Sequence, residues 1–369
     1  MKLLIVAPGF APPWTEGCKN FIRDLIPELQ ARIELQILSA AVSSIPAPGS
    51  VSFPVTYAAS RYKSTQLWVL LRALKRQLST ADRPDVVVHF PYGTFDGLRG
   101  LANTHSVIRT HQLVTRAGVA CITLLYSMTG GNLSGLLARV PTLATIAVGG
   151  WSGYAVNTGI RISDAMPPAT PRNMRELLFM AGYHENKPAL LKNILHTRGL
   201  MDVIRLGESL GKNGFRLTIA APLLRHAERR AELTAILRRE APSLPVQMMG
   251  EVDVYELFRR HSLYLFPYRQ NHNVFIPTSV LEAMASGIPI VISDLPMFRP
   301  LIGTENKFGL SYPVGNLEGL LRAILEAHAN CEMTRERAAR AARHVRRDWT
   351  VQRSAEQLLS VAGRLLAGR

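Results

Sequence analysis

The stretch Tyr264–Asp294, YLFPYRQNHNVFIPTSVLEAMASGIPIVISD, predicts a strand, a loop, a helix and a second strand. Tyr264–Phe266 is a short apolar run that Pro267 closes, and Ile288–Ile292 is a second run rich in β-branched residues. Strands of a parallel sheet are buried on both faces, so they are apolar throughout and do not alternate. The stretch therefore indicates two buried parallel strands joined by a helix.

The helix between these runs has the features of an anion-binding helix. We expect Thr278 or Ser279 to cap it, Glu282 to lie in its first turn and Gly287 to end it. The backbone N–H groups of Thr278, Ser279 and Val280 would then point beyond the carboxyl edge of the sheet, where the helix dipole favours a phosphate. A carboxylate one turn into the helix suits the vicinal hydroxyls of a ribose. The predicted ligand is a nucleoside diphosphate that carries a sugar.

The segment PTSVLEAMASGIPIVISD also resembles the signature of the family-four glycosyltransferases of GT-B fold, the glycosyl transferases group 1. That signature is Glu-x7-Glu followed by Ala-Met-Ala-x-Gly-x-Pro-Val-Val, a small residue and Asp. Glu282 matches the second acid, which the resemblance assigns to the donor ribose. Val274 stands at the place of the first acid, and we expect Asn273 beside it to contact the donor. The resemblance implies an α/β fold of GT-B type, with two Rossmann-like doubly wound domains facing a cleft.

Length and composition fit two globular domains. The chain has 369 residues, and single cores stop growing near about 250 to 300 residues. Hydrophobic residues make up 47% of the sequence and charged residues 19%, which is ordinary for a globular protein. The three cysteines are far apart and lack Cys-x-x-Cys spacing, so neither a disulfide framework nor a zinc site is predicted. We expect a cytoplasmic protein, with membrane association as a further option.

The net charge of +16 predicts acidic partners, because the excess of lysine and arginine is spread over both halves of the chain. A membrane surface, a nucleotide and a polyanion all fit this charge. Nucleic acid is not predicted, because no zinc-finger spacing or RNP-type aromatic motif occurs. Residues 61–79 form an amphipathic basic helix that either packs on the sheet with a solvated rim, which we favour, or lies on anionic lipid. The arginines at 337, 340, 343 and 347 form a second basic stripe with the same two interpretations.

The first half begins with a strand, Lys2–Ala7, a loop and a helix whose apolar stripe continues past Pro27. A strand over Ile33–Ser39 follows. The family has a Gly-Gly pair in the first loop, close to the donor phosphates, and Gly17 matches its second glycine. Another strand, Asp85–Phe90, carries His89 near its carboxyl end, where a satisfied core histidine is the favoured interpretation.

The strand Ala120–Tyr126 ends where the family has a histidine that reaches the donor sugar. Tyr126 stands at that position, so the resemblance makes it a catalytic candidate. The composition of Ser163–Asn173 is that of a linker. We therefore expect an acceptor-binding domain over residues 1–165, a nucleotide-sugar domain over 170–345, and a final helix over 346–369 that packs back on the first domain.

The second half repeats the strand–helix pattern with Glu176–Ala181 and a helix that begins at Leu200. Arg198 and Gly199 resemble the Lys-Gly pair with which the family neutralises the diphosphate. A leaving diphosphate develops charge in the transition state, so a cation is required if no metal serves. Arg198 is therefore the second catalytic candidate.

Three further residues complete the predicted donor site. Lys187 and Lys192 are candidates for the additional cation that the family places before the helix, and Val252 is a candidate for a turn that contacts the base. No Asp-x-Asp occurs, so we predict no metal site, and the nucleotide sugar is a co-substrate with no separate cofactor.

The predicted function is transfer of a sugar from a nucleoside diphosphate sugar to a hydroxyl acceptor, with retained configuration and without metal. A lipid-linked or polysaccharide acceptor fits the basic surface. Motifs for dinucleotide oxidoreductases, P-loop proteins and zinc proteases are absent from the sequence. Two alternatives share the fold: a nucleotide-sugar epimerase, and a non-catalytic protein that binds a nucleotide sugar or a partner enzyme.

Overall fold

The computed structural model describes residues 1–8, 10, 17–42, 54–60, 66–91, 97–124, 145–146, 155–156, 159–162, 174–182, 186–270 and 276–368. The chain divides into two compact units. Unit 1 comprises residues 1–160, 272–276 and 350–369, and unit 2 comprises residues 161–271 and 277–349. Each unit has its own parallel sheet and its own hydrophobic core, so the predicted α/β fold is confirmed.

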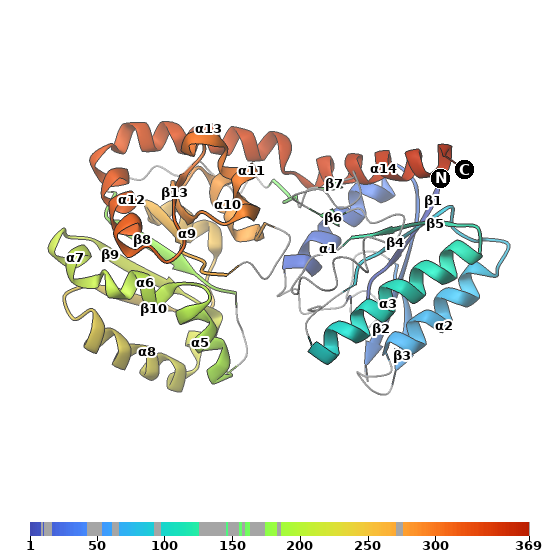
Figure 1. The fold of residues 1–369 in the computed structure, drawn as a ribbon, viewed down its shortest axis with the longest axis horizontal. Helices are drawn as coiled ribbons and strands as arrows, with labels where there is room; N and C mark the ends of the chain where they lie inside the picture. Colours follow the sequence, from blue (N-terminus) through green and yellow to red (C-terminus); the bar gives the residue numbers. More distant parts are fainter. Residues whose placement is uncertain are drawn as a thin grey trace. The chain divides into compact units, whose positions relative to one another are not determined.

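The sheet of unit 1 has the order β3-β2-β1-β4-β5, and all its pairings are parallel (Figure 1). The central strand β1 is fully buried on both faces, which explains the unbroken apolar run at the start of the sequence. The strands are β1 (Lys2–Val6), β2 (Glu34–Val42), β3 (Thr56–Ser60), β4 (Val86–His89) and β5 (Ala120–Thr123). A separate short pair is formed by β6 (Thr145–Ile146) and β7 (Ala155–Val156).

Helices cover both faces of this sheet (Figure 1). On one face, α1 (Gly17–Gln30) and α14 (Val351–Ala367) pack against Leu3 and Ile5. On the other face, α2 (Gln66–Leu78) and α3 (Gly97–Arg116) pack against Leu4 and Val6. The helical stripe predicted for α1 is confirmed, because its apolar side chains are buried although Pro27 lies inside the helix.

The sheet of unit 2 has the order β10-β9-β8-β11-β12-β13 and is also parallel throughout (Figure 1). β11 pairs with β12 in the register Tyr264 to Ile290, so the two apolar runs of the 264–294 stretch are neighbouring strands, as predicted. The strands are β8 (Glu176–Met180), β9 (Arg216–Ala220), β10 (Val246–Met249), β11 (Leu263–Phe266), β12 (Ile290–Ser293) and β13 (Leu310–Tyr312).

The helices of unit 2 mostly follow the predicted ranges, with one clear difference. The helix expected from Leu200 onward is two helices that meet at Leu206, although its apolar positions are buried as predicted. The α-helices are α5 (Pro188–His196), α6 (Leu200–Arg205), α7 (Gly207–Lys212), α8 (Ala227–Glu240), α9 (Val254–Arg260), α10 (Thr278–Ser286), α11 (Arg299–Ile302), α12 (Leu317–Ala329) and α13 (Cys331–Asp348), and the 3-10 helices are η2 (Pro222–Arg225), η3 (Pro296–Phe298) and η4 (Thr304–Asn306).

None of the helices in these ranges has the length and apolar character needed to cross a bilayer.

His89 occupies the carboxyl end of β4, opposite Thr123 of β5. Its side chain is completely buried, and neither ring nitrogen has a hydrogen-bond partner within the described ranges. Burial lowers the pKa of His89 to about 3, because the protonated ring would lose its hydration. His89 is therefore a neutral core residue. The sequence analysis favoured a core histidine with hydrogen-bonded ring nitrogens, but no such bond is found in the described part of the chain.

Among the described glycines of unit 2 that have a positive φ, Gly199, Gly287 and Gly315 show what a side chain would cost. Gly287 ends α10 with φ 77°, as predicted. Gly199 precedes α6 with φ 74°, and a Cβ there would lie 1.8 Å from the carbonyl oxygen of Pro267, just beyond β11. Gly315 has a similar φ of 73°, but a Cβ there would meet no atom within 4 Å. Gly199 thus combines a backbone requirement with a close approach between two loops.

Substitution of these glycines should separate the two effects. We expect Gly315→Ala to lower the free energy of unfolding by about 1 kcal/mol, which is the cost of a strained backbone. Gly199→Ala should cost at least about 3 kcal/mol, because the Pro267 carbonyl must also move. Hydrogen exchange of the β11 amides would measure both values in the same unit. Equal losses for the two variants would show that the contact with Pro267 has no energetic weight.

Because of His89, unit 1 should become less stable as the pH is lowered. The pKa of about 3 in the folded protein lies below the ordinary histidine pKa of 6.5. Between these values only the unfolded chain binds the proton, so stability is lost as the pH falls, by up to about 1.4 kcal/mol per pH unit. His89→Met should reduce the loss between pH 6.5 and about 5 by roughly 2 kcal/mol. Hydrogen exchange of the β1 amides at several pH values would measure this loss of stability. His196→Met, which lies in unit 2, is the control and should leave the pH dependence of the wild-type protein. If His89→Met also leaves it unchanged, His89 is not the cause of the loss.

Candidate functional site

The candidate site lies within unit 2, where the strand order reverses. The chain passes from β8 to β9 on one side and reaches β11 on the other, so the loops that follow β8 and β11 diverge at this point. Ligands of open α/β sheets bind at such a switch point, beyond the carboxyl ends of the strands. The segments that meet there are the Arg198–Gly199 loop, the residues after β11 and the start of α10.

A column of aromatic rings runs along β11 to this edge. Phe258 and Tyr264 contact each other edge to face with centroids 5.8 Å apart, and Tyr264 and Phe266 follow at 5.9 Å. Phe266 stacks on Tyr268 at 3.8 Å. The guanidinium carbon of Arg198 lies 4.2 Å from the centroid of the Tyr268 ring. Tyr268 therefore holds the side chain of Arg198, the cation predicted to bind the diphosphate, through a cation–π contact.

An ion pair fixes the loop that carries Arg198. The Arg269 guanidinium donates two hydrogen bonds to the Asp202 carboxylate, and the one from Nε to Oδ2 measures 2.7 Å. The Asp202 side chain is only 2% exposed. The hydrogen bond to Asp202 raises the pKa of Arg269, and the Arg269 amide also donates to the carbonyl of Thr197 at 2.9 Å. The loop after β11 is thus joined to the loop before α6 by main-chain and side-chain bonds.

The start of α10 differs from the prediction in its cap. Pro277 occupies the N-cap position, with φ −55° and ψ 131°, and no side chain caps the helix. Thr278 and Ser279 are the first helical residues, so they cannot act as the cap. The Val280 amide donates to the Pro277 carbonyl at 3.0 Å, whereas no hydrogen bond engages the amides of Thr278 and Ser279 within the described residues. Two of the three predicted phosphate donors therefore remain available.

Glu282 lies one or two residues further into α10 than predicted. Because α10 begins at Thr278, its first turn contains no acid, and Glu282 falls in the second turn as a half-buried side chain. The prediction was wrong because it assumed a start one or two residues later, after a Thr or Ser cap. The carboxylate still belongs to the half-exposed side of the helix, together with Thr278 and Ser279.

The hydroxyl of Tyr264 connects these groups. It donates to the Ser279 hydroxyl at 3.4 Å, and the phenol is fully buried. Burial is the largest cause of its raised pKa; the negative charge of Glu282 adds to the increase, and the positive charge of Arg198 opposes it. Ser279 is thus the residue that bonds the Tyr264 hydroxyl, and the charges of Glu282 and Arg198 both act on that hydroxyl.

The other predicted residues are more dispersed. Lys187 is the N-cap of α5, Lys192 lies exposed on the same helix, and Val252 follows β10 as a half-buried residue. Gly17 begins α1 in unit 1. Tyr126, Asn273 and Val274 lie outside the described residues. Of the predicted set, the structure brings together Arg198, Gly199, Thr278, Ser279 and Glu282, and the binding roles of all of them stay predictions.

Sequence reasoning missed the residues that support this group. Tyr264 was predicted only as a buried strand residue, and neither Asp202 nor Arg269 was singled out. Asp202 left one signal, because it interrupts the apolar positions Leu200, Val203 and Ile204 at the start of a helix. A buried acid in such a stripe needs a cation, but the sequence does not show which one.

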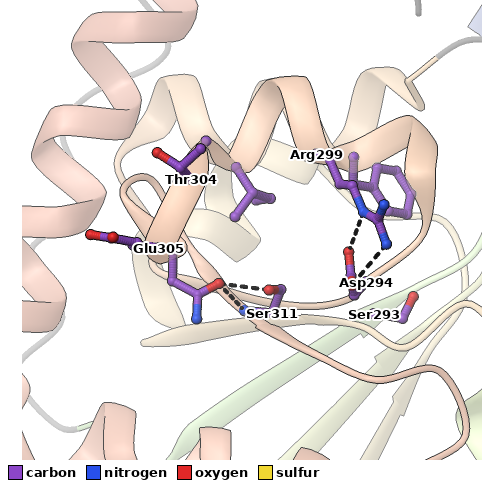
Figure 2. Close-up of a pocket in the computed structure, with 10 residues that line it drawn as sticks. Ser293, Asp294, Arg299, Thr304, Glu305 and Ser311 are labelled. Atoms are coloured by element: carbon purple, nitrogen blue, oxygen red, sulfur yellow. Dashed lines mark hydrogen bonds and ion pairs between the residues drawn. The ribbon is translucent and has the colours of Figure 1, made fainter.

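A separate cavity of about 390 Å³ lies where the 264–294 stretch ends (Figure 2). Asp294 is held there by Arg299 through bonds of 2.9 and 3.1 Å, and Asn306 accepts two hydrogen bonds from Ser311. The cavity is lined by Ser293, Asp294, Phe298, Arg299, Ile302, Gly303, Thr304, Glu305, Asn306 and Ser311. None of the predicted donor-site residues lines it. Within the described ranges, no group of three or more His, Cys, Asp or Glu side chains is placed to hold a metal ion.

Comparison with known proteins agrees with this geometry. Residues 202–330, which include β11 and α10 but not Arg198, match the family described as Glycosyl transferases group 1. The chain is 33% identical over 122 residues to the lipopolysaccharide core biosynthesis mannosyltransferase LpcC of Rhizobium leguminosarum bv. viciae. That alignment covers 33% of this chain and about a third, 34%, of the relative.

Solved structures resemble the whole chain. A glycosyltransferase from Rickettsia africae ESF-5 superposes with a TM-score of 0.70 at 11% identity, covering 100% of both chains. Anabaena Alr3699/HepE, solved in complex with UDP, gives a TM-score of 0.70 at 12% identity and covers 99% of this chain and 100% of its own. The lipopolysaccharide outer core galactosyltransferase WaaB gives 0.62 at 12% identity, with 99% of each chain covered. The chain thus has the GT-B fold, and its residues 202–330 match the family described as Glycosyl transferases group 1.

Proposed function

We propose that this protein is a glycosyltransferase that moves a sugar from a nucleoside diphosphate sugar to a hydroxyl acceptor, with retained configuration and without metal. One observation carries the proposal: the Tyr264 hydroxyl bonds Ser279 at the start of α10, where the Thr278 and Ser279 amides have no partner within the described residues, and the charges of Glu282 and Arg198 act on the same hydroxyl. Each group suits a different part of one ligand. Amides at a helix N-terminus bind phosphate, a cation binds diphosphate, and a carboxylate accepts hydrogen bonds from ribose hydroxyls.

The chemistry follows from where charge develops. In a front-face substitution the acceptor oxygen bonds to the anomeric carbon while the bond from that carbon to the diphosphate oxygen breaks. The departing diphosphate takes the acceptor proton, so no side-chain nucleophile is needed. Its growing negative charge is met by Arg198 and the α10 amides, which are already oriented and need no rearrangement. Lys187 and Lys192 are proposed as further cations, Gly17 as a close approach to the donor phosphates, and Val252 as a contact to the base.

The donor sugar itself is assigned to residues outside this cluster. Tyr126 replaces the histidine of the resembling family and Asn273 lies beside the missing first acid, so we propose that these two contact the sugar. With the usual Glu and His replaced, an unusual or deoxygenated sugar is consistent with the proposal. The similar proteins suggest which donor and acceptor to test first: HepE is solved with UDP, and LpcC is a mannosyltransferase of lipopolysaccharide core biosynthesis. We therefore propose UDP as the first nucleotide to test and a lipid-linked or polysaccharide acceptor.

Donor binding should depend on Glu282. In isothermal titration against a panel of nucleoside diphosphates, we expect one tight binder, and Glu282→Ala should weaken it at least about tenfold through the lost charged hydrogen bonds. Glu318→Ala removes the same charge from an exposed position of unit 2 and should bind like wild type. If no nucleoside diphosphate binds wild-type protein, the proposed donor site is excluded and the partner-binding alternative stands.

Transfer should proceed with a chelator present. We expect mass spectrometry of purified protein, incubated with pooled nucleotide sugars, candidate acceptors and chelator, to reveal a glycosylated product. Arg198→Met should lower its rate by roughly a hundredfold or more, since a donor to the developing charge is lost. An isomerised donor would instead identify the epimerase, and a bound but unchanged donor a non-catalytic role.

A further inference from the structure

The exposed face of α2 combines an aromatic residue with three cations. Trp68 is 61% exposed, which is unusual for so large an apolar side chain. Arg72, Lys75 and Arg76 follow it at four, seven and eight residues, so all four lie on one side of the helix. The opposite side, with Leu70, Leu71, Leu74 and Leu78, is buried in the core of unit 1.

These cations keep their charge directed to solvent. Within the described residues, no ion pair engages Arg72, Lys75 or Arg76. Ser79 donates its hydroxyl to the Lys75 carbonyl and its amide to the Arg76 carbonyl, so these bonds use the main chain of the two residues and not their charged groups. The nearest acid after the helix, Asp82, is engaged by Lys2 and Gln36. The outer face of α2 is therefore a net positive surface and not a network of ion pairs.

The basic stripe of α13 has a different character. Arg337 lies 3.9 Å from Glu326, Arg340 lies 3.8 Å from Glu336, and Arg347 binds Asp348 at 2.7 Å. Much of the charge that the sequence placed on this stripe is thus neutralised within the protein. This contrast separates two helices that the sequence presented as equivalent candidates for lipid contact.

α3 extends the positive face of α2. The two helices lie side by side on the same face of the sheet (Figure 1), and the rings of Trp68 and His105 lie 6.0 Å apart. The sequence of α3, GLRGLANTHSVIRTHQLVTR, contains no acid, and Arg109 and Arg116 are exposed. Neither helix carries a carboxylate that would repel an anionic surface.

We propose that the outer face of α2 and α3 docks unit 1 on an anionic lipid bilayer. Lysine and arginine side chains meet the headgroup phosphates, and a tryptophan beside them enters the interface, where its ring has an apolar body and a polar N–H. The helices then lie in the plane of the membrane. The inference deepens the proposed function, because a lipid-linked acceptor is met at a membrane, but its test measures membrane binding alone.

The exposed tryptophan favours lipid over the other polyanions. A nucleic acid would use the same cations, but a single aromatic residue on a helix face gives no groove that tracks a backbone and no row of stacking platforms. An acidic protein would also be attracted to the charge. A bilayer uses both components of the face together, the cations for the headgroups and the ring for the boundary with the acyl chains.

Flotation with lipid vesicles tests the proposal. The full-length protein is mixed with vesicles of phosphatidylcholine alone, or of phosphatidylcholine and phosphatidylglycerol in equal parts, at low and at physiological salt. We expect partition into the anionic vesicles that weakens with salt, because exposed charges are screened. R72Q/K75Q/R76Q should lower the partition coefficient about a hundredfold, and Trp68→Ala about tenfold.

A matched variant distinguishes location from overall charge. R340Q/R343Q/R347Q removes three charges from α13 and should float like wild type. Circular dichroism and titration with the nucleoside diphosphate identify any variant that has lost its fold, and they report the donor site independently of membrane binding. The proposal is overturned if wild-type protein ignores anionic vesicles, if the α2 variants float like wild type, if the α13 variant is the one that loses binding, or if the protein binds a nucleic acid in place of the vesicles.

Discussion

The bidentate pair between Arg269 and Asp202 is the interaction on which the candidate site depends. Asp202 is a carboxylate almost wholly removed from water, and an unpartnered charge at such a position would strongly destabilise the fold. Its partner must therefore stay in place, and with it the loop that follows β11. Because the Arg269 amide also holds Thr197, the segment that carries Arg198 is fixed from both sides. A lysine would not replace Arg269, since a single ammonium lacks the planar fork that engages both carboxylate oxygens.

Strand β11 contributes both to the core of unit 2 and to the candidate site. Tyr264 packs in an aromatic column through its ring and reaches Ser279 through its hydroxyl. α10 begins without a side-chain cap, although a cap typically contributes about 1 kcal/mol to a helix. Pro277 satisfies the Val280 amide, and the amides before it are left for a ligand. A helix start of this kind suits the binding of a phosphate better than it suits stability.

Net charge alone does not locate the partners of this protein. The excess of sixteen positive charges is distributed over both halves of the sequence. On α13 three arginines, Arg337, Arg340 and Arg347, form ion pairs with acids of α12 and α13, which are worth little at a surface but do neutralise the field. On α2 the cations have no such partners within the described part of the chain, and an exposed tryptophan accompanies them. The arrangement of charges, and not their number, distinguishes the two surfaces.

The sequence by itself determined the α/β fold and the segments that supply the candidate site, but it did not predict β3 or α3. Apolar runs such as Leu3–Val6 and stripes such as that of α1 are local patterns, and burial follows from them directly. Gly287 could be assigned as a helix end because its role needs only its own backbone. The tertiary structure decided what depends on neighbours. Pro277 is the N-cap of α10, Leu206 divides two helices, Gly199 is pressed against Pro267, and Asp202 is paired with a residue 67 positions away. Which strands lie side by side sets these contacts, and strand adjacency is a non-local property that no single stretch of sequence contains.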